Sequence, residues 1–314
     1  MKYDLLCIGD ISLDMFMKID ESELSSFTSS NSTQICFLHG AKIAVKEVEF
    51  TIAGNSLNVC VGSKKLGLDV KLYSETGDDY YSMQLVKELG QMGAGTEYIK
   101  HNAGKRIPIH PVMVSKTERT IFSYHENWKY NLFDWGNPKW IYYTSMCPEY
   151  EDFQAELVDY VKKNPDIGIA FGPGTYHMRS GVEKLKNILE VTDILILNEE
   201  EAQSFVGKFD SKTTHKKLQE LGPNLTVVTA GKNGASADDG NIYEHMDAVE
   251  LDSPIVDKTG AGDSFSSAFM AAILHKKSLK EALKWGVYNS AANITEIGSI
   301  TGILDLKQMQ EMIK

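Results

Sequence analysis

Short apolar runs alternate with segments of helical character along most of this chain, and that alternation limits the folds open to it. The clearest runs are WIYYTS (140–145), IGIAFG (167–172), DILILN (193–198) and NLTVVTAG (224–231). Each is short and ends in a glycine or a polar residue, as a buried strand does. The segments EDFQAELVDYVKKN, SGVEKLKNILE and EEEAQSFVG stand between them and read as helices. We therefore predict an α/β fold with a doubly wound, mostly parallel sheet flanked by helices.

Two stretches interrupt this rhythm. Residues 14–52 and 106–126 contain apolar runs at strand spacing with no convincing helix between them. We predict that they form a small β-sheet lid over the substrate site, while 1–13, 53–105 and 127–314 form the α/β core. The alternative is an extra hairpin packed at the edge of the main sheet.

The net charge of the chain limits the classes of partner that it can bind. The formal net charge is −11, which gives no bulk attraction for nucleic acid or for an anionic membrane. We expect neither as a partner, and an anionic ligand would need a local positive site. The N-terminal segment lacks the long apolar run of a signal peptide. The four cysteines show no metal-ligand spacing and read as free thiols, so we expect a cytoplasmic protein.

Two common phosphate-binding loops are excluded by the glycine spacing. A Walker loop needs Ser or Thr after its Gly-Lys pair, but the three Gly-Lys pairs here are followed by Arg106, Phe209 and Asn233. A dinucleotide fingerprint needs a third glycine, and Phe265 stands in its place after Gly260-Ala-Gly. An oxidoreductase with a dinucleotide loop is therefore not expected.

The stretch DKTGAGDSF (257–265) offers a different anion site. Apolar helical spacing begins at Phe265, so a helix starts close to Gly260–Asp263. A helix start presents unpaired N–H groups and a partial positive charge, and glycines let an oxygen approach them. A carboxylate at Asp263 would repel a phosphate there, unless it takes a proton from an attacking hydroxyl. The plainer reading is a capping aspartate with close helix packing.

This stretch resembles the second signature of the ribokinase-like, or pfkB, family of carbohydrate kinases. Other motifs of that family follow in the same order: GDISLD (9–14), AGNSLNVCVGSKKLG (53–67), TERTIFSYHEN (117–127), LNEEEAQSFVG (197–207), VVTAGKNGA (227–235) and NSAANITEIGS (289–299). The resemblance implies a ribokinase-like fold. It also implies transfer of the γ-phosphoryl group of ATP to a primary hydroxyl of a small sugar. Asp263 would be the base, and Gly260, Ala261 and Gly262 would form the anion hole.

The resemblance also implies where the cofactors bind. The residues it assigns to the nucleotide are Asn198, Glu201, Thr229, Gly231, Gly234 and Asn289. Of these, Asn198 and Glu201 would hold Mg²⁺ largely through water, and Asn289 would lie near the adenine. Asp257 resembles a ligand of the family's monovalent cation, which would be K⁺.

Four residues are implied to hold the acceptor: Asp14, Gly54, Asn55 and Asn58. Carboxylate and amide groups beside an accessible backbone suit an array of hydroxyls. Ala53 departs from the family's first signature, where a glycine is usual, so the sugar of a relative does not transfer to this chain.

Two other functions stay open beside a sugar kinase. A nucleoside kinase of the same family would phosphorylate the 5′-hydroxyl of a ribose, with lid aromatics stacked on the base. A catalytically silent sensor of sugar or ATP is disfavoured, because the Gly-Ala-Gly-Asp and N-x-x-E motifs are intact.

The lid residues implied to exclude water are Phe37, Ile109, Phe122 and Tyr124. The alternating segment 43–50 is either an edge that pairs two lids in a homodimer or a face turned toward the ligand.

Overall fold

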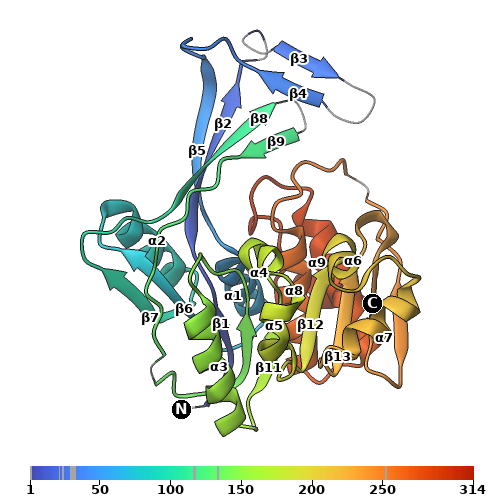
Figure 1. Cartoon of the computed structure of the whole chain (residues 1–314). Helices are drawn as coiled ribbons and strands as arrows, with labels where there is room; N and C mark the ends of the chain where they lie inside the picture. Colours follow the sequence, from blue (N-terminus) through green and yellow to red (C-terminus); the bar gives the residue numbers. More distant parts are fainter. Residues whose placement is uncertain are drawn as a thin grey trace.

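The computed structural model describes residues 2–20, 22, 25–28, 33–115, 118–132, 134–251 and 253–314. Across these residues the main sheet has nine strands in the order β15-β14-β13-β12-β11-β10-β1-β6-β7 (Figure 1). Neighbouring strands from β13 to β7 run parallel, and β14 and β15 are antiparallel. The strands are β1 (Lys2–Ile8), β6 (Val70–Gly77), β7 (Gly95–Asn102), β10 (Asn137–Tyr143), β11 (Gly168–Phe171), β12 (Ile194–Asn198), β13 (Leu225–Thr229), β14 (Ala235–Asp238) and β15 (Tyr243–Met246).

Helices cover both faces of this sheet. One apolar layer includes residues of α1 (Asn55–Lys65), α2 (Tyr80–Gln91), α8 (Ala261–Leu274), α9 (Leu279–Asn293) and α10 (Leu306–Met312). The other includes residues of α3 (Glu151–Lys163), α5 (Val182–Leu189), α6 (Glu199–Val206) and α7 (Ser211–Gln219), with α4 (Thr175–Ser180) beside them. The predicted fold class, a mostly parallel sheet flanked by helices, is confirmed.

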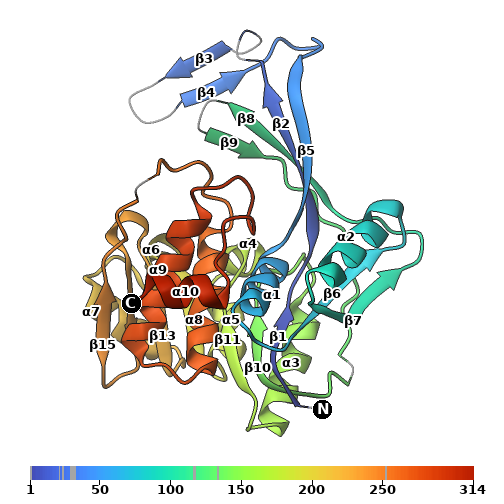
Figure 2. The ribbon, with the colours of Figure 1, turned by 180° about the vertical axis from the view of Figure 1, so that it is seen from behind.

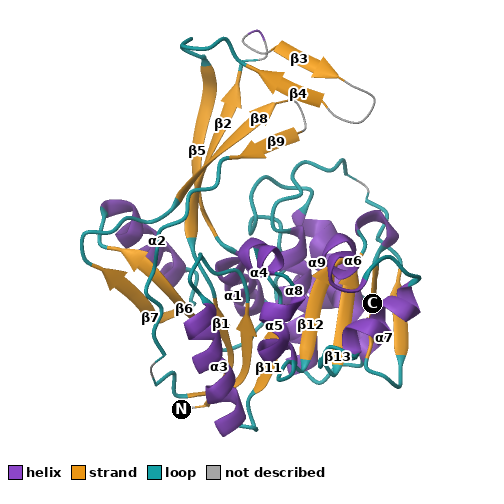
Figure 3. Cartoon of the chain, in the orientation of Figure 1, coloured by secondary structure: helices purple, strands orange, loops and turns teal. Residues whose placement is uncertain are grey.

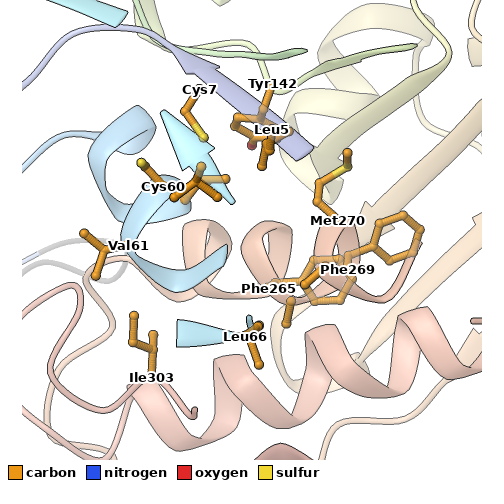
Figure 4. Packing of buried hydrophobic residues seen from close by; sticks show 14 of the residues in the cluster. Leu5, Cys7, Cys60, Val61, Leu66, Tyr142, Phe265, Phe269, Met270 and Ile303 are labelled. Carbon is orange, nitrogen blue, oxygen red and sulfur yellow. The ribbon is translucent and has the colours of Figure 1, made fainter. Parts of the chain in front are cut away.

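Strand β1 shows how the sequence builds this double core. Successive side chains of a strand point to opposite faces, and Leu5 and Cys7 join one layer while Leu6 and Ile8 join the other. Because both faces are covered, the strand has no polar alternation. Figure 4 shows the first layer, where Cys7 from β1 and Cys60 from α1 lie near α8.

A smaller sheet stands off the carboxyl edge of the main one (Figures 1 and 2). Its order is β5-β2-β8-β9, with β2 (Ser12–Ile19), β5 (Val45–Ala53), β8 (Ile109–Ser115) and β9 (Glu118–Ile121). The hairpin β3 (Ser25–Thr28) and β4 (Thr33–Cys36) lies beside it (Figure 3). Both interrupting stretches thus form strands, although residues 116 and 117, between β8 and β9, lie outside the described residues. The exact division into core and lid stays a prediction.

The small sheet is tied to the core by short connections. β1 leads to β2 through three residues, Gly9–Ile11, and β5 runs into α1 across Gly54 alone. Val48 and Phe50 of β5 have exposed side chains, but pairing of two copies through this sheet stays a prediction. No helix among the described residues is long and apolar enough to cross a membrane.

Candidate active site

Helix α8 starts where the glycine stretch predicts. Its N-cap, Gly260, has a φ of 71°, a left-handed conformation that glycine adopts without strain. A Cβ at Gly260 would also lie 2.6 Å from the Ser299 carbonyl oxygen, whereas one at Gly262 would meet nothing within 4 Å. The N–H of Ala261 donates to the Lys258 carbonyl at 3.3 Å. Within the described residues, the Gly262 and Asp263 N–H groups have no backbone acceptor. These two remain open toward an anion.

Both carboxylate oxygens of Asp263 accept hydrogen bonds from α1. The Asn58 amide donates to Oδ2 at 2.7 Å, and the Asn55 amide donates to Oδ1 at 3.0 Å. The two asparagines are three residues apart and therefore share one face of the helix. The structure thus brings together a predicted base and two predicted acceptor ligands from opposite ends of the chain.

The protonation of Asp263 is set by opposing effects. Burial raises the pKa of its carboxyl group to about 6, and the hydrogen bonds from Asn58 and Asn55 lower the same pKa. A carboxylate with this pKa is ionised at neutral pH and is a better proton acceptor than an ordinary aspartate.

Asn198 and Glu201 lie at the start of α6, directly after β12. They form a reciprocal cap: Asn198 Oδ1 accepts from the Glu201 N–H at 2.9 Å, and Glu201 Oε2 accepts from the Asn198 N–H at 2.8 Å. Burial raises the pKa of Glu201 most, and repulsion by the negative charge of the nearby Asp263 raises it further. A divalent cation beside Glu201 would offset that repulsion, so the site fits Mg²⁺. Among the described residues no group of three acidic, His or Cys side chains gathers, and Mg²⁺ commonly relies on water and phosphate for its other ligands.

The predicted nucleotide turn follows β13. Thr229 ends that strand, and Gly231 and Gly234 have φ values of 53° and 80° around a short 3-10 turn. A Cβ at Gly234 would collide with the Met246 carbonyl oxygen. These glycines are required by the path of the backbone, and their contact with a nucleotide stays a prediction.

Asn289 is held by hydrogen bonds inside the core. Its side chain is fully buried, donates to the Ser264 carbonyl oxygen at 2.7 Å and accepts from the Leu304 N–H at 2.8 Å. The amide therefore joins α9 to α8 and to the segment after it. Its predicted place near the adenine stays a prediction.

Asp257 is buried and receives several donors. Its Oδ1 accepts from the backbone N–H and the hydroxyl of Thr259, its Oδ2 accepts from the Gly298 N–H, and Arg119 of β9 forms an ion pair with it. The site predicted for a monovalent cation thus contains a guanidinium from the small sheet. Arg119 lies in the motif TERTIFSYHEN, but nothing in the sequence pairs it with Asp257, which is 138 positions further along the chain.

Asp14 of β2 is buried beside a histidine, His110, that lies outside the quoted motifs. His110 Nδ1 lies 3.4 Å from Asp14 Oδ1, and His110 Nε2 lies 3.0 Å from the Tyr124 carbonyl oxygen. β2 and β8 pair in parallel with Asp14 opposite His110, which places the two side chains on one face. Knowledge of that register would have identified His110.

The small sheet and the loop before α8 enclose a cavity of about 460 Å³. Phe16, Lys18, Arg119, Asp257 and Lys258 are among its lining residues. Of the predicted water-excluding residues, Ile109 is half-buried and Phe37, Phe122 and Tyr124 are exposed. Their role in excluding water stays a prediction.

The sequence matches the model of the "pfkB family carbohydrate kinase" over residues 15–306. The chain belongs to this family of carbohydrate kinases. It is an ATP-dependent phosphotransferase of the pfkB family, and its fold is ribokinase-like.

Three known proteins illustrate the range of the family. The chain is 25% identical to an ATP-dependent 6-phosphofructokinase of Thermoanaerobacterium thermosaccharolyticum, covering 99% of this chain and 94% of the relative. It is 27% identical to a nucleoside kinase of Methanothermobacter thermautotrophicus, covering 96% and 93%. The solved structure of Arabidopsis thaliana ribokinase with ribose and ATP aligns with a TM-score of 0.85 and 20% identity, covering 100% and 99%. The chain is thus a carbohydrate or nucleoside kinase.

Proposed function

We propose that this pfkB-family kinase transfers the γ-phosphoryl group of ATP to a primary hydroxyl of a small sugar. The arrangement at Asp263 carries this proposal. Its carboxylate lies at the start of α8, beside the open N–H groups of Gly262 and Asp263 and beside the amides of Asn55 and Asn58. A base and an anion site at one point are what in-line transfer from a phosphate to a hydroxyl requires.

Each residue then has a task. Asp263 takes the proton of the attacking hydroxyl, and the helix start holds the charge that develops on the transferred phosphoryl oxygens. Mg²⁺ neutralises phosphate charge when bound, and Asn198 and Glu201 would hold it largely through water. Asp14 binds acceptor hydroxyls from the small sheet, and Gly54 and Asn55 bind them from the start of α1.

A nucleoside acceptor is the second candidate. Phe122 and Tyr124 expose about half of their side-chain surface, and the Tyr124 carbonyl is hydrogen-bonded to His110 beside Asp14. Aromatic surfaces next to hydroxyl-binding residues could stack on a base. The similarity to a nucleoside kinase supports the same candidate.

The test is ADP release from the purified protein with Mg-ATP and KCl, across pentoses, hexoses, sugar acids, sugar phosphates and nucleosides. We expect turnover with one class of sugar, and turnover lower by about 10²–10⁴-fold in Asp263→Asn. Turnover with nucleosides alone would replace the first candidate by the second. Turnover that persists in Asp263→Asn would disprove the assignment of the base.

A further inference from the structure

Ser299 lies between two parts of the site and ends the motif NSAANITEIGS, but the proposed function gives it no task. It follows α9 and is 4% exposed. Its hydroxyl donates a 2.9 Å hydrogen bond to Asn58 Oδ1 of α1. Asn58 in turn donates to Asp263 of α8. The two hydrogen bonds thus link Ser299 through Asn58 to Asp263.

The two ends of the Asn58 amide determine the direction of these hydrogen bonds. An ionised carboxylate only accepts hydrogen bonds, so the amide turns its NH₂ group toward Asp263. Its oxygen is then directed away into a buried position, because Asn58 is 5% exposed. A buried acceptor without a donor is unfavourable, and the Ser299 hydroxyl is the donor that this orientation needs.

The same short segment also braces the loop before α8. The Gly298 N–H donates to Asp257 Oδ2 at 3.0 Å. The Ser299 backbone lies so close to Gly260 that a Cβ there would be 2.6 Å from the Ser299 carbonyl oxygen. Ser299 therefore contacts the anion site through its backbone, and its side chain is linked to the base through Asn58.

We propose that Ser299 is a positioning residue for phosphoryl transfer, whose hydroxyl holds Asn58 where it donates to Asp263 and so aligns the base with the helix start. The inference rests on the proposed role of Asp263. In this proposal the Ser299 hydroxyl acts through Asn58.

The test compares Ser299→Ala with wild type in kcat/KM against pH, using an acceptor that the wild type phosphorylates. Loss of the hydroxyl frees the Asn58 amide to turn, so Asp263 loses a donor that favours its charged form. We expect the acidic limb to move up by about one pH unit, which makes the deficit about tenfold near pH 5 and less than twofold near pH 8.5. Glu201 and Tyr142 are the other ionisable groups that interact with Asp263, and the substitution alters neither.

Ser180→Ala is the matched control. This substitution removes the half-buried hydroxyl at the end of α4. That hydroxyl accepts a hydrogen bond from the Tyr150 hydroxyl and donates one to the Tyr176 carbonyl oxygen. We expect its pH profile to match that of wild type. A Ser299→Ala deficit that is equal at every pH would reduce Ser299 to a structural residue and overturn the proposal.

A double-mutant cycle tests the route through Asn58. In the Asn58→Ala background, Ser299→Ala should change kcat/KM by less than about twofold, because the amide it positions is gone. A full additional loss would show that Ser299 acts elsewhere.

An acceptor-independent measurement separates this inference from the proposed function. The free energy of unfolding in urea, followed between about pH 4 and 8 relative to Asp263→Asn, reports the pKa of Asp263. An upward shift of that pKa in Ser299→Ala would support the proposal even if no acceptor is turned over. An unchanged pKa would overturn it even in an active kinase.

Discussion

The guanidinium of Arg119 forms an ion pair with the buried carboxylate of Asp257, which links the small sheet to the loop in front of α8. The same carboxylate accepts from Thr259 and Gly298, so it organises the backbone that leads to Gly260. A charge carried by the small sheet therefore stabilises the loop of the anion site. A buried carboxylate needs such a partner.

The first prediction concerns monovalent cations. Because Arg119 supplies a positive charge at Asp257, we expect wild-type turnover to change less than about twofold when KCl is replaced by tetramethylammonium chloride. Arg119→Met should lower turnover and make it respond to K⁺, since a cation can then approach the unpaired carboxylate. ADP release under both salts measures this. Lys18→Met removes another positive charge from the same cavity and should stay insensitive to K⁺; a wild type that requires K⁺ would contradict the prediction.

The second prediction concerns the base. Asp263→Asn should lower kcat by about 10²–10⁴-fold, because general-base help is removed while the shape of the side chain is kept. Binding of Mg-ATP, measured by calorimetry, should weaken by no more than a few-fold. If the variant loses ATP affinity instead of turnover, Asp263 serves the nucleotide rather than the acceptor.

The third prediction follows from the pKa of about 6 at Asp263. Below that pH the carboxyl group is protonated and cannot act as a base, so kcat/KM should fall on an acidic limb near pH 6. Because the folded-state pKa is raised, the folded protein binds this proton more tightly than the unfolded chain does. The contribution of Asp263 to stability should therefore decline as pH rises from about 4 to 6 and stay constant above. Urea unfolding of wild type and Asp263→Asn across this window measures the effect; a difference that does not vary with pH would refute it.

The fourth prediction uses two neighbouring glycines as a matched pair. Gly260→Ala should reduce stability by about 1–3 kcal/mol, because it adds a left-handed alanine and a collision with Ser299. Gly262→Ala lies in helical backbone with open space around it, so its stability should rise by about 0.5–1 kcal/mol. Its methyl group would nevertheless enter the anion site, so turnover should fall at least about tenfold. Thermal unfolding and ADP release together separate the two outcomes; an active Gly262→Ala would place the phosphate elsewhere.

The fifth prediction concerns the acceptor. Asp14→Asn should raise the KM for the acceptor by about tenfold to a hundredfold, since hydrogen bonds to a charged group are lost. The KM for ATP should hardly change. Asp20→Asn is the control, because Asp20 follows the other end of β2 and is paired with Lys46. Equal effects of the two variants would argue for a general disturbance of the small sheet.

The alternation of apolar runs and helices was sufficient to predict the fold class, a mostly parallel sheet flanked by helices. Each strand such as β1 is buried on both faces, so its composition alone marks it as an interior parallel strand. The glycine stretch likewise predicted the start of α8, because the left-handed backbone at Gly260 favours a glycine at that position. The hairpin β3–β4 was predicted only in part, because four-residue strands carry little periodicity.

The contacts that complete the site depend on register and distance in space. His110 meets Asp14 because β2 and β8 are paired in a particular register. Arg119 and Ser299 reach Asp257 and Asn58 across 138 and 241 positions of the chain. No local pattern encodes these separations. For Asn289 the motif position suggested a place near the adenine, and the structure adds a buried bridge from α9 to α8 that no motif indicated.

The burial of α8 bears on how this enzyme fails on heating. Nine consecutive residues after Asp263, from Ser264 to Ala272, are buried in the core. The carboxylate thus stands on a helix whose local unfolding would expose a large part of the core. Heat inactivation and global unfolding should consequently share one midpoint, with no inactive but folded state between them. A substitution that raises the midpoint of global unfolding should therefore raise the midpoint of heat inactivation by the same amount.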